Sequence, residues 1–578
     1  MYMYMYMYMH IYIQGVTGRR GRAWCSRALV ATMVAVVAAC ASASAGGAGG
    51  TSGGGSSGGG YSRSDERRLV GSFSDVRAVG LSRRYLYAAT GSGIAVYDRL
   101  FNAWLAPLSR ENGLVDPQIT VMAGDPVEDA VWLGVPGAVM VYRPQSEQLQ
   151  RTMLVGIPDV IVFDRGIGGD AFVRSGGQWS RVSRSGFATP VAGPPPAAQL
   201  VLPSTLADVY ARYPGLRSGS PLLFRRQQSD RPLRPYPVQT GTFSLDQPSE
   251  VWLGTGGDGV YKVDATLQQA TPLRYGLLER GVGALGLSLD GVWAAGLGAS
   301  LLRGGLTFAS TDLQRWRWID GTIAVPMQGM RATSMSVRAQ RAWIGTDRGV
   351  VRARLDAGED LVVWTSLDGL PDDRVYAVAA RDDGAWVGTA RGLVFVSDTT
   401  EQRNTRTRGL GVQLLANTPV YALQPVGDTL WIGSEAGLLA FGQISGKSPA
   451  LLRPLGADPA LRGRVTALAF SDSVLLAATD RGVVQLSPRG GVEPFRVLAL
   501  NVADVGQVTR LAMDDRTVVM AGLDGVVVMQ RAGGIRLLRV GTDLPGAALD
   551  VVMSRDWLWI ATPEGLVRLR RAGDGGLP

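Results

Sequence analysis

Arginine and carboxylate side chains recur at turn positions in the second half of the sequence, and these residue types could bind a polar ligand. Some stand one or two residues before a recurring glycine, and others lie in a connector that precedes an apolar run. The full set is Asp347, Arg348, Asp372, Asp373, Arg374, Arg391, Glu435, Asp480 and Arg481. Guanidinium and carboxylate groups on one face can hydrogen-bond sugar hydroxyls or an acidic partner. Turns also favour such residues because they are exposed to solvent, so this plainer explanation stays open.

The sequence restricts catalysis and metal binding by what it lacks. Its one histidine is His10, and its two cysteines are Cys25 and Cys40. The residues after Cys40 therefore have no imidazole and no thiol, which excludes a Ser-His-Asp or Cys-His nucleophile and a His/Cys zinc or copper site. We expect no catalytic residues, no metal, no cofactor and no disulfide. Carboxylates are plentiful, but no pair stands apart from the turn background.

The net charge of +9 does not indicate a nucleic-acid partner. Four arginines lie in the N-terminal leader, which contains no acid, so the remainder carries 9 − 4 = +5. These charges are dispersed along the chain and form no basic run. We therefore expect no nucleic-acid binding.

The N-terminal residues have the pattern of a lipoprotein export signal. Arginines precede a twelve-residue apolar stretch at 28–39, which is too short to span a bilayer, since a membrane helix needs about 20 residues. Val37-Ala38-Ala39-Cys40 resembles a bacterial lipobox, in which Cys40 would carry the lipid. Ordinary cleavage after Ala43 is the alternative. We predict a signal at 1–40 and a bacterial envelope protein bound to the membrane by its lipid.

A stretch of Gly, Ser and Ala follows Cys40 directly. It cannot bury apolar surface and should behave as a flexible coil. We expect residues 41–66 to tether the folded part. Ala41 is not the Asp associated with inner-membrane retention in well-studied envelopes, which favours the outer membrane.

One pattern recurs about every 43 residues: an aromatic residue, Gly two positions later, Thr or Ser, a turn ending in Gly, then an aliphatic run. Such a period with several short strands is typical of propeller blades. Ten units are readable, and Phe172 and Tyr210 are candidate leads for two more. The expected structural residues are Trp132, Trp252, Trp293, Trp343, Trp386, Trp431 and Trp559, with the turn glycines Gly349, Gly392, Gly437, Gly482, Gly525 and Gly565. We expect the tryptophans to pack in the core rather than stack on a ligand, and the Gly after each Trp to make room for a neighbouring large ring.

Residues 368–378 and 381–389 resemble the two-component regulator propeller repeat, and Asn112-Gly113-Leu114 and Asp543-Leu544-Pro545 echo its Asp-Gly-Leu-Pro connector. The resemblance covers 75–142 and 245–571. It implies paired propellers of the kind found in bacterial sensors, where a membrane helix, a kinase and receiver domains follow. Only a short tail, 572–578, follows the last repeat here, so we expect a stand-alone lipoprotein without a signalling output.

The fold class predicted is all-β: tandem β-propellers of four-stranded blades, about twelve in all, most simply six plus six. The last repeat lacks a fourth strand, and an open blade would leave an unpaired edge. We expect residues 69–73 to close a first propeller at 67–308 and Trp316–Asp320 to close a second at 309–571. A seven-plus-five split or an inserted ring stays open.

In such blades the turn after strand two and the connector lie on one face, so the nine charged turn residues should surround one mouth of the second propeller. The leading hypothesis is a non-enzymatic, sensor-like module in the envelope that binds a protein or glycan ligand. A hydrolase or lyase acting on polysaccharide would need a cluster of buried acids with shifted pKa values. An envelope assembly scaffold would instead show an apolar patch on one rim.

Overall fold

A computed structural model describes residues 67–571, apart from gaps at 115–117, 166–169, 218–236, 245–246, 248, 268, 299–303, 321–326, 328, 357–359, 399–414, 443–451, 455–460, 462, 487–491, 495–504 and 532. The predicted signal, Cys40, the tether and the tail lie outside the described residues. No helix in the described part of the chain has the length and apolar character needed to cross a membrane.

The predicted all-β class and the four-stranded blade are confirmed. The described residues form eleven antiparallel sheets, nine with four strands, one with five and one with three. In nine of them the strand order follows the chain, because each hairpin turn joins neighbouring strands. The exceptions are the sheet in which β1 lies beside β44 and the five-stranded sheet, in which β14 lies beside β10. The repeat found in the sequence is therefore the repeat of the fold.

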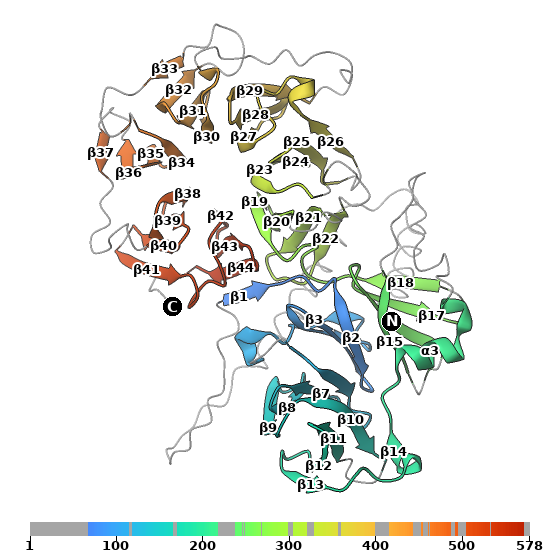
Figure 1. The fold of residues 1–578 in the computed structure, drawn as a ribbon. Helices are drawn as coiled ribbons and strands as arrows, with labels where there is room; N and C mark the ends of the chain where they lie inside the picture. The colour runs from blue at the N-terminus through green and yellow to red at the C-terminus, as the bar shows by residue number, and fades with distance from the viewer. Residues whose placement is uncertain are drawn as a thin grey trace, which may run out of the picture. The chain divides into compact units, whose positions relative to one another are not determined.

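Seven blades surround one axis and form a ring, which we call the seven-bladed ring (Figure 1). Their first strands contact each other in succession, and β42 of the seventh blade contacts β19 of the first, so the ring is closed. The blades are, in order, β19 (Val282–Ser288), β20 (Gly291–Gly296), β21 (Gly305–Ser310) and β22 (Trp316–Asp320); β23 (Ala332–Arg338), β24 (Arg341–Thr346), β25 (Gly349–Arg354) and β26 (Leu361–Trp364); β27 (Val375–Ala380), β28 (Gly384–Thr389) and β29 (Gly392–Ser397); β30 (Val420–Val426), β31 (Thr429–Ser434), β32 (Gly437–Gly442) and β33 (Leu452–Pro454); β34 (Val465–Ser471), β35 (Val474–Thr479), β36 (Gly482–Leu486) and β37 (Val492–Pro494); β38 (Val508–Met513), β39 (Thr517–Gly522), β40 (Gly525–Gln530) and β41 (Gly534–Arg539); and β42 (Asp550–Met553), β43 (Trp557–Thr562), β44 (Gly565–Arg570) and β1 (Arg67–Val70).

Four further blades form what we call the four-bladed unit. The blade that contains β15 packs on that of β2, β2 packs on β6, and β6 packs on β10, while helix α3 covers β15. The described residues do not place β10 and β15 in comparable contact, so the four blades form an arc. Its elements are β2 (Val76–Leu81), β3 (Tyr85–Thr90), β4 (Gly93–Asp98) and β5 (Ala103–Trp104); β6 (Val121–Gly124), β7 (Val131–Val135), β8 (Ala138–Arg143) and β9 (Gln148–Met153); β10 (Pro158–Asp164), β11 (Ala171–Ser175), β12 (Gln178–Val182), β13 (Ala188–Val191) and β14 (Leu200–Val201); β15 (Val238–Phe243), β16 (Glu250–Thr255), β17 (Val260–Asp264) and β18 (Gln269–Leu273); with α3 (Leu206–Arg212) and the short 3-10 turns η1 (Arg110–Asn112), η2 (Ala197–Gln199) and η3 (Pro214–Leu216).

The predicted closing strands are wrong. The N-terminal strand β1 pairs with β44, with Leu69 opposite Val567, and so completes the last blade of the seven-bladed ring (Figure 1). Trp316–Asp320 does not pair with the last blade of a propeller, because it forms β22, which pairs with β21 of its own blade. The free outer edge of β44 needed a partner, and the strand at the opposite end of the chain supplies it.

The six-plus-six division is also wrong. The predicted boundary between 308 and 309 falls inside β21, in the first blade of the seven-bladed ring. The four-bladed unit is instead inserted between β1 and β19, so the alternative of an inserted ring describes the chain best. Phe172 does lie on the second strand of a blade, β11, whereas Tyr210 lies on α3.

The repeated Trp, Gly and Thr hold the blades together. Six of the seven tryptophans are fully buried, and Trp431 is half-buried. The Gly two positions after Trp252, Trp343, Trp386 and Trp431 accommodates a valine of the neighbouring blade, not a large ring: a Cβ on Gly388 would lie 2.7 Å from Val420 Cγ1. The Thr closes the following turn, as Thr346 Oγ1 donates to Gly349 O at 2.7 Å. Among the turn glycines, Gly349, Gly392, Gly437, Gly482 and Gly565 have φ between +108° and +150°, and Gly525 is outside that region.

The Asp-Gly-Leu-Pro connector is a capped turn with an apolar anchor. The 3-10 turn η5 (Ser366–Asp368) is held by Asp368, whose carboxylate accepts a hydrogen bond from the backbone N–H of Thr365 at 2.9 Å. Gly369 then turns the chain with φ +108°, which favours glycine, and Leu370 is buried. The connector thereby fixes where the next inner strand begins.

Candidate functional site

The inner strands of the seven-bladed ring share one irregularity. In β19, β23, β27, β30, β34 and β38 the register with the second strand shifts by one residue directly after the first residue of the strand. Such β-bulges bend a strand and redirect a side chain, and they are frequent near functional sites. The bulged residues are Gly283, Thr333, Tyr376, Tyr421, Thr466 and Thr509, and Leu549 before β42 takes the corresponding place in the seventh blade.

These seven residues, one from each blade, line a single cavity of about 400 Å³. The volume lies within the range of about 300–1,000 Å³ common for small-molecule sites. The other lining residues are Leu297, Arg331, Ala332, Asp347, Arg374, Val375 and Arg510. The cavity therefore exists only because the ring closes, since no blade alone contributes more than a small part of its wall.

Two tyrosines form one side of the cavity. The ring centroids of Tyr376 and Tyr421 lie 5.4 Å apart at an interplanar angle of 32°. Tyr421 Oη donates to Glu435 Oε2 at 2.8 Å, and Arg464 Nε donates to the same oxygen at 2.9 Å. Burial and the hydrogen bond to Glu435 raise the pKa of Tyr421 to about 12, so the phenol stays a neutral donor. The Glu435–Arg464 pair thus fixes the position of this aromatic wall.

Arg510 crosses the cavity between blades that are not neighbours. It follows the bulge of β38 in the sixth blade, yet Nη2 donates to the carbonyl oxygen of Thr333 in the second blade at 2.7 Å. Nη1 donates to Thr509 O at 2.9 Å, and Nε lies 3.4 Å from a carboxylate oxygen of Asp550. The guanidinium is therefore held from three sides inside the ring.

Asp550 is the buried counterpart of Arg510. Its carboxylate accepts hydrogen bonds from the backbone N–H of Leu285 at 2.8 Å and of Val551 at 3.0 Å. Burial raises the pKa of Asp550, and the charge of Arg510 and the two backbone donors oppose this only in part. Because Leu285 belongs to β19, this carboxylate also joins the last blade to the first.

The predicted charged turn residues divide into four groups. Asp347 and Arg374 line the cavity. Asp372 and Glu435 lie one contact away: Arg374 Nε and Arg391 Nε lie 3.3 and 3.5 Å from Asp372, and Glu435 holds Tyr421. Asp373 instead accepts hydrogen bonds from Ser366 of its own connector. Arg348, Asp480 and Arg481 are exposed and do not line the cavity.

Sequence reasoning missed the bulged residues and Arg510. Their signal is present when the repeats are aligned: Val375-Tyr376-Ala377, Val420-Tyr421-Ala422, Val465-Thr466-Ala467 and Val508-Thr509-Arg510 begin four inner strands. The middle position varies between units while its valine neighbour does not. A variable position beside a constant valine indicates that the valine packs in the core and that the variable side chain can face a ligand.

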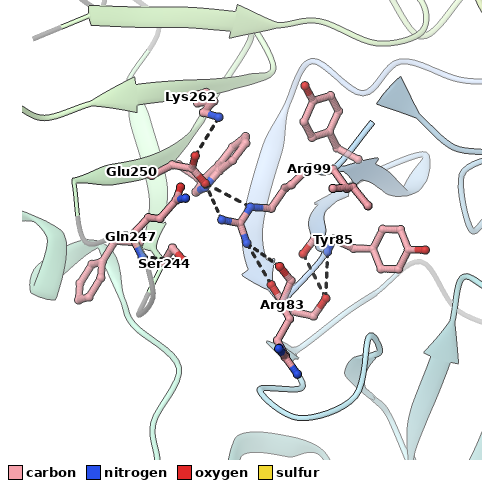
Figure 2. A network of polar contacts seen from close by, with 12 residues as sticks. Arg83, Tyr85, Arg99, Ser244, Gln247, Glu250 and Lys262 are labelled. Carbon is pink, nitrogen blue, oxygen red and sulfur yellow. Dashed lines mark hydrogen bonds and ion pairs between the residues drawn. The ribbon is translucent and has the colours of Figure 1, made fainter. Parts of the chain in front are cut away.

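A second polar network lies within the four-bladed unit (Figure 2). Glu250 Oε1 accepts hydrogen bonds from Arg99 Nη2 at 2.6 Å and from Trp252 Nε1 at 3.1 Å, and Oε2 lies 2.8 Å from Lys262 Nζ. Burial alone would raise the pKa of Glu250, but Lys262 and Arg99 outweigh it and hold the pKa below its usual value. The network joins Arg99, which follows β4, to Glu250 on β16, and both carboxylate oxygens of Glu250 have partners.

The described residues contain no group of His, Cys, Asp or Glu side chains placed to bind a metal ion. No protein-family model matches the sequence, and no curated protein is similar to it.

Several solved structures are similar to this chain. PorZ, described as an essential bacterial surface component of the type-IX secretion system of Porphyromonas gingivalis, superposes with a TM-score of 0.51 at 13% identity, over 88% of this chain and 87% of that one. The extracellular domain of the putative one-component system BT4673 from B. thetaiotaomicron has a TM-score of 0.39 at 13% identity, over 86% and 69%. A streptogramin B lyase has a TM-score of 0.40 at 11% identity, over 50% and 93%. The likeness to PorZ extends over both groups of blades, and it shows a shared fold.

Proposed function

We propose that this protein is a non-enzymatic binding module of sensor-like type, which takes a glycan or a segment of a protein into the mouth of its seven-bladed ring. One observation carries the proposal: the bulged positions of all seven blades converge on one cavity. Core packing does not require the two tyrosines there, since the neighbouring positions of the same strands hold the valines and alanines that fill the core. Thr333, Thr466 and Arg510 also hydrogen-bond the backbone of other blades. Apolar walls with a few fixed polar groups are the usual composition of a ligand site.

We further propose that the module works in a bacterial envelope, held through a lipid on Cys40 and the coil at 41–66, with the outer membrane as the favoured location. The lipobox-like Val37-Ala38-Ala39-Cys40 supports this, as does the likeness to PorZ, a bacterial surface component.

The test is a binding screen of the purified protein against immobilised glycans and against envelope extract, with bound proteins identified by mass spectrometry. The variant Y376A/Y421A should lose the ligand. Phe101→Ala is the matched control, because Phe101 is an exposed aromatic residue of the four-bladed unit, 69% exposed. Retention of the ligand by Y376A/Y421A would place binding elsewhere, and chemical conversion of a bound glycan would show an enzyme instead. Binding to no glycan together with capture of one envelope protein would exclude the glycan branch.

The described residues argue against an enzyme and give one observation in favour of an assembly scaffold. A carboxylate-dependent hydrolase or lyase needs two acids facing the substrate, whereas Asp347 is the one acid among the described residues that lines the cavity and Asp550 lies buried behind Arg510.

An assembly scaffold gains support from three exposed apolar residues at the β9–β10 connector, Met153, Val155 and Ile157, which are 67%, 87% and 57% exposed. Substituting all three with serine would abolish partner capture by a scaffold and leave ligand binding in the ring unchanged.

A further inference from the structure

The cationic groups of the cavity are only partly compensated. Arg331, Arg374 and Arg510 line it together with a single acid, Asp347. The carboxylate of Asp347 is engaged by a backbone donor, the N–H of Arg331 at 2.9 Å, and no ion pair joins the Arg331 guanidinium to another described residue. Arg374 and Arg331 stand at the start of adjacent inner strands, on the exposed side of the cavity. Arg374 pairs with Asp372 and Arg510 with Asp550, so Arg331 is the lining arginine with no recorded ion pair among the described residues, and its charge is available to a ligand at the mouth.

Arg510 provides donors deeper in the same cavity. A guanidinium has five N–H groups in a fixed fork. One on Nη1 meets Thr509 O, one on Nη2 meets Thr333 O, and Nε faces Asp550, so each Nη keeps one N–H without a recorded acceptor among the described residues. Because three contacts hold the fork rigid, these two donors are already oriented for an acceptor in the cavity. Such a group suits the two oxygens of a carboxylate.

The tyrosine wall points to the rest of the ligand. Tyr376 and Tyr421 are half-buried, so they present ring area to the cavity rather than to the core. Aromatic side chains combine a large apolar face with a polar group at the rim, a combination that matches the C–H face and the hydroxyls of a sugar ring. Arg464 and Glu435 hold Tyr421 before any ligand arrives, which lowers the entropy lost on binding.

We propose that the ligand is a saccharide that carries a carboxylate, with its sugar ring on Tyr376 and Tyr421 and its acid group among Arg331, Arg374 and Arg510. This inference rests on the proposed function and specifies the class of ligand. Thr466 and Thr509 lie in the same wall and offer hydroxyl oxygens to the sugar.

The experiment compares three probes by calorimetric titration of the purified protein: trigalacturonate, the neutral galactotriose and triglutamate. Trigalacturonate should bind at least about 10-fold more tightly than galactotriose, since a hydrogen bond to a charged group contributes about 1.5–3 kcal/mol. Its affinity should fall as salt is raised, because added ions screen the arginines. Triglutamate should bind more weakly than trigalacturonate, since it has no ring for the tyrosine wall.

Variants locate the two parts of the site. Arg374→Gln should weaken trigalacturonate at least about 10-fold and leave galactotriose unchanged. Arg510→Lys keeps the charge opposite Asp550 but loses the fork, so it should weaken trigalacturonate while lowering the melting temperature less than Arg510→Ala does. Arg348→Gln is the matched control, because Arg348 is an exposed arginine on the next turn that does not line the cavity. Y376A/Y421A should abolish binding of both saccharides.

Three outcomes would overturn this inference. If galactotriose and trigalacturonate bind with equal affinity, the site does not require a carboxylate on its ligand. If triglutamate binds as tightly as trigalacturonate and still binds Y376A/Y421A, the site does not require a saccharide. If trigalacturonate does not bind while the ligand found in the binding screen still requires the two tyrosines, the inference fails and the proposed function stands. If no ligand requires them, both fail.

Discussion

Arg510 and Thr333 are joined by a hydrogen bond of 2.7 Å that links the sixth blade to the second across the inside of the seven-bladed ring. Two blades, the seventh and the first, separate them along the ring. The contact is therefore a brace across the cavity rather than a contact between neighbours. Its stability depends on Asp550, which balances the charge of Arg510 and also binds the first blade through Leu285.

Arg510→Ala should destabilise the seven-bladed ring by about 3 kcal/mol, because it leaves the carboxylate of Asp550 buried without its cation. The measurement is the denaturant midpoint of the variant against that of the unchanged protein. R510M/D550N should recover part of the loss, since Asn carries no charge and its one side-chain oxygen can still accept one of the two backbone hydrogen bonds. A double variant no more stable than Arg510→Ala would show that the ion pair is not the cause.

Removal of residues 61–71 should open the seventh blade and leave the four-bladed unit folded. β44 would then lose the partner that Arg67–Val70 supplies opposite Leu566–Leu569. Hydrogen exchange of the backbone amides of Gly565–Arg570 should accelerate far more than exchange in Tyr85–Thr90. Equal acceleration in the two strands would mean that the N-terminal strand stabilises the whole chain, and unchanged exchange in β44 would contradict the pairing.

Gly388→Ala should destabilise the ring by about 1–3 kcal/mol, since the new methyl group would lie 2.7 Å from Val420 Cγ1 and 3.0 Å from Val420 O. Gly442→Ala is the matched control, because a Cβ at Gly442 meets nothing within 4 Å. Thermal melting of the two variants measures the difference. Shortening the valine in G388A/V420A should restore part of the stability, and a Gly388→Ala variant as stable as Gly442→Ala would refute the packing role.

Stability should fall in acid through Glu250. Its pKa in the folded protein is held below the usual value, so the ionised form stabilises the fold fully above about pH 4.5. This contribution is lost as the pH falls through the folded pKa, because the proton then enters a site built for a carboxylate. Melting temperatures of Glu250→Gln and the unchanged protein should differ at pH 7 and converge below pH 4. A constant difference across this range would exclude titration of Glu250 as the source.

Local patterns sufficed to predict the blade. Trp343-Ile344-Gly345-Thr346 specifies a buried second strand, a glycine that clears space for Val375 of the next blade and a threonine that closes the turn. These contacts lie within one repeat or between consecutive repeats. The sequence of one or two repeats therefore determines these contacts. For this reason the all-β class and the four-stranded blade could be predicted.

The ring closure and the wall of the site were decided by tertiary structure alone. Residues 67–70 and 316–320 both form short outer strands of mixed polar and apolar residues, and nothing local indicates that the first pairs with β44 and the second with its own blade. The six bulged residues and Leu549 come together only when β42 meets β19, and Arg510 reaches Thr333 only across that closed ring. Both results depend on contacts between residues hundreds of positions apart, whose free energy is set by the completed fold and leaves no trace in the spacing of the repeat.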